Sequence, residues 1–401
     1  MRSSGSVWST WSRRATAGGL GLMLLGLAAS PADAQSVRSR EWHLDTMHAD
    51  EMWQSSTGKG VTVAVIDSGV NPSLPDLSGQ VLKGKDFSDR PGDERTDYAQ
   101  HGTSIAAVIA GTGKGKGAFG LAPGAKILPL RTSDNSGTAN SAAEEFADFS
   151  KSVAAAIRYA ADSDAKVINI SLASRGSVPE LAEAVKYAKA KGKLIFAGVG
   201  NSGGKGNPVM YPAATPGVVG VGAVDKDLKA TAESERGPQV DLVAPGDEIV
   251  QACEGGTGIC TGHGTSASSA LASASAALVW SKHPEWTANQ VTRVLLNTAG
   301  GPVNGEKRSD TVGYGMIRPR IALKDPGDPG PADVDPLPGP GAKSPEPGAS
   351  KSAGAGAPER AAADSSSDGG GSSTLWIALG AGAVVVAGAV AGVTVVRRRR
   401  A

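Results

Sequence analysis

Two copies of the tetrapeptide HGTS each place a potential base three residues before a potential nucleophile. The first copy runs from His101 to Ser104 and the second from His263 to Ser266. A serine hydroxyl attacks a peptide carbonyl when a neutral imidazole accepts its proton. The sequence therefore raises the question of which histidine serves which serine.

Peptide hydrolysis by a serine also requires a carboxylate that orients the imidazole, and donors that hold the oxyanion. Asp67 follows the apolar run VTVAVI, and Asn201 follows LIFAGVG. We expect Asp67 to orient a histidine that acts as the base for Ser266. The Asn201 amide and the backbone N–H of Ser266 are expected to hold the oxyanion. Each residue alone is also typical of ordinary turns, so their co-occurrence favours the catalytic interpretation.

The remaining serine and histidine of the two copies, Ser104 and His263, are not expected to be the nucleophile or the base. Ser104 is expected to be a small packing residue in the helix that His101 begins. His263 is not expected to be the base, because no orienting carboxylate is evident near it in the sequence.

Near-continuous apolar runs predict strands that are buried on both faces of a parallel sheet. They cover residues 61–67, 126–130, 166–172, 193–199 and 217–224. Helices are predicted at 141–161, 178–191, 265–282 and 287–298. This alternation predicts a three-layer α/β domain with a mostly parallel central sheet, whose active site lies outside the carboxyl ends of the strands.

Four segments resemble the signature segments of the subtilisin-like serine proteases, in the order used by that family. They are VAVIDSGV with Asp67, HGTSIAAVIAG with His101, FAGVGNSG with Asn201 and GHGTSAS with Ser266. The resemblance implies the subtilisin-like fold and a triad of Asp67, His101 and Ser266, in which His101 is the base. It also implies that Asn201 lies in the oxyanion hole. It also implies that an extended substrate pairs with one cleft wall, which consists of Ser171, Leu172, Ala173 and Ser174.

The chain departs from the family pattern at two places. Ala270 stands where the family usually has a proline, which is a mild change in a first helical turn. The wall segment SLAS lacks the family's common glycine pair, with Ala173 and Ser174 in its place. The peptide specificity is therefore not readable from the sequence.

The N-terminus is typical of an exported protein. Arg2, Arg13 and Arg14 precede the run GGLGLMLLGLAA, and Ala32 and Ala34 have the spacing of a cleavage site, so residues 1–34 are predicted to be a signal peptide. An uncleaved anchor is the alternative, although the run is short for a bilayer span. Residues 35–59 are too few for a folded pro-domain and are predicted to wrap the catalytic domain of residues 60–323.

The C-terminal part changes composition at residue 324. Residues 324–373 are rich in Pro, Gly and Ser and are predicted to form a disordered tether. Residues 374–396 carry no charge and predict a transmembrane helix, since a core helix would have nothing after it to pack against. The tail 397–401 begins with four arginines, which places the C-terminus in the cytoplasm and the catalytic domain outside the cell.

The cysteines, the histidines and the net charge give three further expectations. Cys253 and Cys260 are close in sequence and are predicted to form a disulfide in an exported protein, with two free thiols as the alternative. No HExxH spacing and no calcium-loop pattern is present, so we expect no metal and no cofactor. A formal net charge of +1 gives no reason to expect a nucleic-acid partner.

The order of these segments resembles the mycosins, subtilisin-like proteases associated with type VII secretion. The resemblance implies a membrane-tethered serine endopeptidase that acts on protein or peptide substrates beside type VII membrane components. The alternative is a low-activity structural subunit that stabilises a secretion complex. The intact set of Asp67, His101, Asn201 and Ser266 favours the enzyme.

Overall fold

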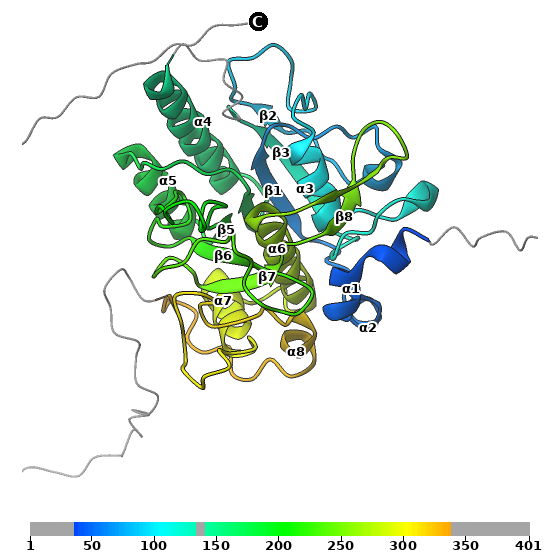
Figure 1. Ribbon diagram of the computed structural model, residues 1–401, viewed down its shortest axis with the longest axis vertical. Helices are drawn as coiled ribbons and strands as arrows, with labels where there is room; N and C mark the ends of the chain where they lie inside the picture. Colours follow the sequence, from blue (N-terminus) through cyan, green and yellow to red (C-terminus); the bar gives the residue numbers. More distant parts are fainter. Residues whose placement is uncertain (1–35, 134–140, 338–401) are drawn as a thin grey trace, which may run out of the picture. The chain divides into compact units, whose positions relative to one another are not determined.

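Seven parallel strands form the central sheet of the computed structural model (Figure 1). Val63 and Val65 pack into one core layer, whereas Ala64 and Ile66 pack into the other. Burial on both faces explains the near-continuous apolar runs from which the sequence predicts five of the strands. In spatial order the strands are β2 (Lys85–Asp86), β3 (Lys126–Arg131), β1 (Thr62–Asp67), β4 (Val167–Ile170), β5 (Leu194–Gly198), β6 (Val219–Val224) and β7 (Leu242–Pro245).

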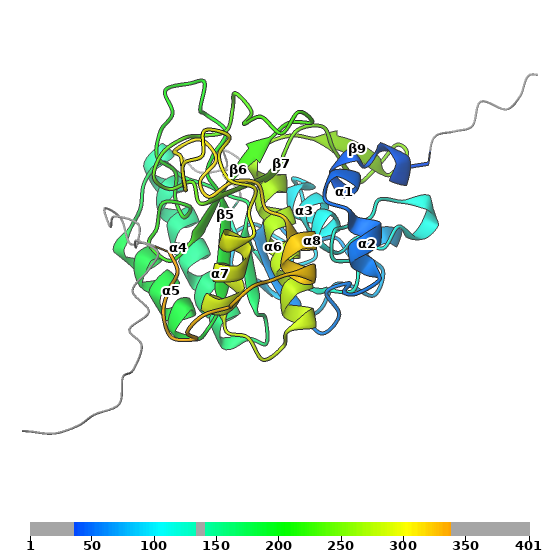
Figure 2. The same ribbon diagram turned by 90° about the horizontal axis from the view of Figure 1, so that it is seen from below.

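Helices cover both faces of this sheet (Figures 1 and 2). One face carries α4 (Ala142–Asp162) and α5 (Pro179–Ala190). The other carries α3 (His101–Ala110), α6 (Thr265–Lys282), α7 (Ala288–Asn297) and α8 (Pro319–Lys324). The predicted three-layer α/β fold is therefore confirmed. Helix α6 is buried around most of its circumference, which explains its small Ala and Ser residues.

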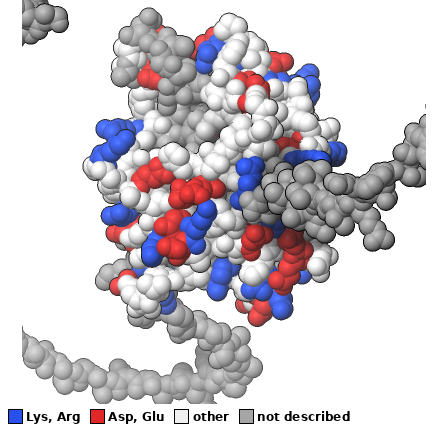
Figure 3. All heavy atoms as spheres, turned by 45° about the vertical axis from the view of Figure 1, so that its right-hand side comes forward, with Lys and Arg blue, Asp and Glu red and all other residues white. Residues whose placement is uncertain are grey.

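The structure describes residues 36–133 and 141–337. The predicted signal peptide, the tether beyond residue 337, the span 374–396 and the tail 397–401 lie outside these ranges. Within them, no helix is both long enough and apolar enough to cross a bilayer. Figure 3 shows that acidic and basic side chains are interspersed on one face of the molecule.

The segment before the first strand packs on the domain. It contains η1 (Arg38–Arg40), α1 (Trp42–Thr46) and α2 (Ala49–Trp53). The indole Nε1 of Trp42 donates to the carbonyl of Asp247 at 3.0 Å, and that of Trp53 donates to the carbonyl of Leu121 at 2.9 Å. Leu44 is fully buried in the same core layer as α3 and α6. The described residues of the predicted extension therefore form part of the domain core.

The predicted tether begins too early at residue 324, because its first residues are held on α7. Arg293 Nη1 donates to the carbonyls of Pro329 and Pro331 at 2.6 and 3.0 Å. Its Nη2 donates to the carbonyl of Val334 at 2.6 Å. Pro-rich backbone has carbonyls without ladder partners, and the guanidinium offers five donors to bind them.

Shorter elements complete the described domain. The antiparallel hairpin of β8 (Ile249–Ala252) and β9 (Ile259–Gly262) lies against α3. Two further 3-10 turns are η2 (Pro75–Leu77) and η3 (Lys114–Lys116). The two strands of the hairpin, β7 and the two-residue β2 are not among the strands that the sequence predicts.

Candidate active site

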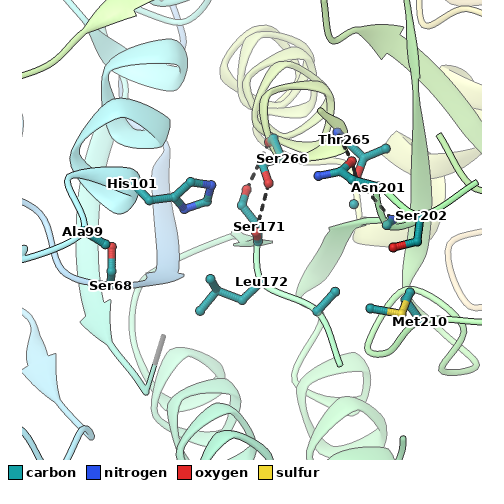
Figure 4. Close-up of a pocket in the computed structure, with 13 residues that line it drawn as sticks. Ser68, Ala99, His101, Ser171, Leu172, Asn201, Ser202, Met210, Thr265 and Ser266 are labelled. Carbon is teal, nitrogen blue, oxygen red and sulfur yellow. Dashed lines mark hydrogen bonds between the residues drawn. The ribbon is translucent and has the colours of Figure 1, made fainter. Parts of the chain in front are cut away.

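Three of the predicted catalytic residues line one pocket at the carboxyl ends of the parallel strands (Figure 4). His101 begins α3, Asn201 follows β5, and Ser266 lies in the first turn of α6. The pocket has a volume of about 370 Å³. Asp67 ends β1 directly behind His101 and is fully buried. The edge of the sheet therefore brings together residues that are far apart in the sequence, as the parallel topology predicts.

A short contact joins the first two members of the predicted triad. His101 Nδ1 lies 2.7 Å from Asp67 Oδ1, which also accepts the backbone N–H of Ser68 at 2.8 Å. Gly102 permits this approach, because a Cβ there would lie 2.2 Å from the carbonyl oxygen of Gly69. A carboxylate on Nδ1 holds the proton on that nitrogen, so that Nε2 is the unprotonated nitrogen of the ring.

A second buried carboxyl group, absent from the sequence predictions, fixes the start of α3. Asp97 Oδ2 accepts from the backbone N and the hydroxyl of Thr103 at 2.8 and 2.6 Å. Its Oδ1 accepts from the Ser68 hydroxyl at 2.8 Å. Burial raises the pKa of Asp97. The available sequence signal was an acidic residue shortly before a helix start, where carboxylates satisfy unpaired N–H groups.

The predicted nucleophile lies at the N-terminus of the central helix. Ser266 is the second residue of α6, after the N-cap Gly264, whose φ is 113°. A Cβ at Gly264 would lie 2.7 Å from Asn201 Nδ2, so this turn requires glycine. The Ser266 hydroxyl donates to the carbonyl of Ser171 at 3.0 Å. The N–H groups of a first helical turn point out of the helix, where they can bind an anion.

Asn201 is held by helix α6, which also carries Ser266. Its Oδ1 accepts from the backbone N and the hydroxyl of Thr265 at 2.8 and 3.0 Å. The same hydroxyl accepts the N–H of Gly200 at 3.2 Å. Since Oδ1 is occupied by donors, Nδ2 is the group that Asn201 offers to a ligand in the pocket.

The predicted substrate wall is only partly in the pocket. Ser171, Leu172 and Ala173 line it. Ser174 instead exchanges two backbone hydrogen bonds with Tyr211, at 2.9 and 2.8 Å, so its backbone is already paired. Figure 4 shows Met210 at the end of the pocket away from His101, on the side of Ser202.

A second pocket, of about 470 Å³, shares His101 and Ser266 with the first. Cys253 and Cys260 line it as free thiols, so the predicted disulfide is not formed in this structure. The hairpin register places Cys260 opposite Gln251, and Cys253 is therefore not its direct partner. Burial, and then the neighbouring Cys260 thiol, raise the pKa of Cys253 to about 12.

His263 also lines this second pocket. The expectation that no carboxylate lies near it is wrong. Both carboxylate oxygens of Glu233 lie 3.0 Å from His263 Nδ1, so a carboxylate partner does exist. The His263 side chain is 71% exposed, whereas that of His101 is 38% exposed and its partner Asp67 is fully buried. That His263 is not the base stays a prediction. Within the described ranges, no group of three or more His, Cys, Asp or Glu side chains could hold a metal ion.

Comparisons with known proteins match this arrangement. The Subtilase family model matches residues 58–316. The "Thermophilic serine proteinase" of Bacillus sp. (strain AK1) is 39% identical over 210 residues, which are 52% of this chain and 49% of that protein. Subtilisin E of Bacillus subtilis (strain 168) is 34% identical over 61% of this chain and 62% of its own length. The chain thus spans about half to two thirds of the length of these relatives.

Solved structures resemble the chain over most of the described residues. The MycP3 protease from the type VII (ESX-3) secretion system is 33% identical with a TM-score of 0.62, covering 70% of this chain and 87% of that one. A chain of the periplasmic assembly from the ESX-5 inner membrane complex is 28% identical with a TM-score of 0.66, covering 79% and 92%. With a family match that covers well over half of its length, this chain belongs to the subtilase family of S8 peptidases.

Proposed function

We propose that the chain is a serine endopeptidase in which Asp67, His101 and Ser266 form the catalytic triad and Asn201 holds the oxyanion. The observation that carries the proposal is the 2.7 Å contact from His101 to the fully buried Asp67, in a pocket that Ser266 and Asn201 also line. A carboxylate, an imidazole, a hydroxyl and an amide at one site fill every role of acyl transfer to serine.

The chemistry follows from these groups. His101 Nε2 takes the proton of the Ser266 hydroxyl as its oxygen attacks the peptide carbonyl, and the resulting imidazolium is stabilised by Asp67. The hydroxyl must first turn away from the Ser171 carbonyl, to which it donates at rest. The Asn201 Nδ2 and the Ser266 N–H then stabilise the oxyanion, and His101 returns the proton to the leaving amine.

The two pockets suggest how a peptide lies across Ser266. Leu172 and Ala173 lie at the pocket wall without a strand partner among the described residues, so an extended peptide can add to them as a strand. The pocket that ends at Met210 would receive the side chain before the cleaved bond. The pocket lined by the two cysteines would receive the leaving side.

We further propose that the protease is mycosin-like, works beside type VII secretion components, and is tethered to the membrane through residues 374–396 with its catalytic domain outside the cell. The resemblance to the MycP3 protease and to the ESX-5 assembly supports this. The second candidate, a low-activity subunit that stabilises a secretion complex, is favoured by the ESX-5 likeness, because that neighbour is part of an assembly.

Covalent labelling with a fluorophosphonate tests the catalytic proposal. The full chain should be labelled, and Ser266→Ala should abolish the labelling. Labelling that persists in Ser266→Ala would refute the nucleophile assignment. Secretion by cells that carry only the Ser266→Ala protein separates the two candidates: full secretion supports the structural role, and its loss supports the protease.

A further inference from the structure

Desolvation raises the pKa of three carboxyl groups outside the triad to about 7: those of the buried Glu41 and Glu235 and of the partly buried Asp241. Each accepts a backbone N–H, from Phe119, Ser202 and Gly220 respectively. Glu41 belongs to the N-terminal extension, and Asp241 lies at the amino end of the sheet, away from the pocket. Only Glu235 contacts the segment that carries Asn201.

Glu235 contacts that segment on both sides of Asn201. Its Oε1 accepts the N–H of Ser202 at 3.3 Å, and its own N–H donates to the carbonyl of Gly200 at 3.2 Å. The carboxyl carbon packs closely on Gly200, because a Cβ there would lie 2.6 Å from it. The side chain has no solvent exposure, and Oε2 has no hydrogen-bond partner among the described residues.

The two supports of Asn201 are thus of different kinds. Thr265 holds the amide oxygen, as described above, whereas Glu235 holds the backbone that sets where the side chain begins. Hydrogen-bond donors to an oxyanion act only when they are held close to their productive position. A shift of the backbone beside Asn201 would therefore move Nδ2 away from the developing charge.

We propose that Glu235 is a positioning residue that places the oxyanion donor Asn201 by clasping Gly200 and Ser202 from behind the pocket. This inference rests on the proposed function, because it requires Asn201 to act in the reaction. Glu235 is absent from the lining of the pocket, so it acts through Asn201 and does not touch the substrate.

The charge state of Glu235 determines which variant is its closest mimic. Burial raises the pKa of Glu235 to about 7, while the hydrogen bond from the Ser202 N–H and, by less, the charge of Arg175 lower it. Near neutral pH a large fraction of the group is uncharged and places no negative charge beside the oxyanion. Glutamine has the same shape, retains the acceptor oxygen and is neutral, so Glu235→Gln should preserve the clasp. Alanine removes it.

The test is labelling of the full chain by a fluorophosphonate, measured as the limiting rate at saturating probe and as the probe concentration that gives half of this rate. We expect Glu235→Ala to lower the limiting rate about tenfold and to leave the half-saturating concentration within about twofold, since only transition-state stabilisation is lost. Glu235→Gln should keep most of the wild-type rate. Asp241→Ala is the matched control and should lower the Tm without changing the limiting rate.

A double-mutant cycle connects the effect to Asn201. Asn201→Ala should lower the limiting rate by about 100-fold or more. Adding Glu235→Ala in that background should then cost little, because the donor that Glu235 positions is already gone. If Glu235→Ala does not fold, Glu235→Asp replaces it, since a side chain shortened by one methylene cannot both accept the Ser202 N–H and pack on Gly200.

The outcomes separate this inference from the function on which it rests. An unlabelled wild-type chain, or an Asn201→Ala variant at the wild-type rate, refutes the proposed function and the inference with it. A slow Asn201→Ala variant combined with a wild-type rate in Glu235→Ala overturns the inference alone. Equal losses from Glu235→Ala in the presence and absence of Asn201 overturn it as well, because the carboxyl would then act elsewhere.

Discussion

The two HGTS tetrapeptides both lie at helix starts, but the helix begins at a different residue in each. In the first copy His101 is the first residue of α3, so Ser104 falls inside the helix and is buried. In the second copy the helix begins at Thr265, so His263 lies outside it and Ser266 is in the first turn. The position of a residue relative to the helix start therefore decides whether the same letters present a histidine or a serine to the pocket.

The partners of the two copies differ in the same way. His101 contacts a fully buried carboxyl group, whereas His263 contacts Glu233 on the surface. In the first copy Thr103 donates to Asp97, and this contact fixes the start of α3. In the second copy Thr265 donates to Asn201, which lies on the loop after β5. In the proposed mechanism, the first copy supplies the base and the second supplies the nucleophile, beside the proposed oxyanion donor Asn201.

The serines provide the largest contrast between the copies. Ser266→Ala should lower the fluorophosphonate labelling rate by about 1,000-fold or more, because the attacking oxygen is removed. Ser104→Ala should leave the rate unchanged. It should lower the free energy of unfolding by about 1 kcal/mol, since the Ser104 hydroxyl donates to carbonyls of Gln100 and Ala252. Denaturant unfolding and labelling measure both. A large labelling loss in Ser104→Ala would break the comparison.

The histidines should differ nearly as much. His101→Ala should reduce labelling by about 1,000-fold, since the serine loses its base. His263→Ala should change it by less than about tenfold and the unfolding free energy by less than about 1 kcal/mol, because exposed ion pairs contribute little. The same labelling assay checks both. Equal losses in the two variants would assign the base to His263 instead.

The threonines should separate activity from stability. Thr265→Val keeps the shape but removes the hydroxyl that binds Asn201, so we expect the limiting rate to fall about tenfold. Thr103→Val leaves a buried oxygen of Asp97 with one donor fewer and should cost about 1 to 3 kcal/mol of stability with a labelling rate within about twofold. The Tm and the fluorophosphonate labelling rate, measured for both variants, test this division. A slow Thr103→Val enzyme of wild-type Tm would contradict this division.

The smallest expected effect is on the pH dependence of stability, through the Asp97 carboxyl group that binds the first copy. Burial raises the pKa of Asp97 above its ordinary value of 3.8. The folded state then binds its proton more tightly than the unfolded state, so this contribution to stability is present below pH 3.8 and is lost as the pH rises through the folded pKa. Asp97→Asn cannot ionise, so its Tm relative to the wild type should increase as the pH is raised from 4. A constant difference would contradict the raised pKa.

Part of this arrangement could be read from the sequence because it is local. Helix α6 begins and ends where the small-residue run does, and Asp67 and Asn201 follow apolar runs that end at the pocket. The family motifs added the pairing of His101 with Ser266.

Other features depend on contacts between distant segments, which no local pattern reveals. Glu233 and Glu235 reach the site from a loop after β6, and Arg293 captures the Pro-rich segment from the side of α7. Cys253 and Cys260 are close in sequence, which predicted a disulfide. The hairpin register instead places Gln251 opposite Cys260, and both thiols are free.

The hydrogen bond from Trp42 to Asp247 also has a consequence for the order of folding. It joins residues 205 positions apart, and the Ser56 hydroxyl similarly reaches the carbonyl of Leu278 in α6, 222 positions later. The N-terminal segment of the described domain therefore completes its packing only after helix α6, which carries Ser266, has been synthesised. Contacts of such long sequence separation form late, because the chain between them must first be closed into a loop. The N-terminal segment would then be among the last parts of the domain to become resistant to proteases as the chain is made.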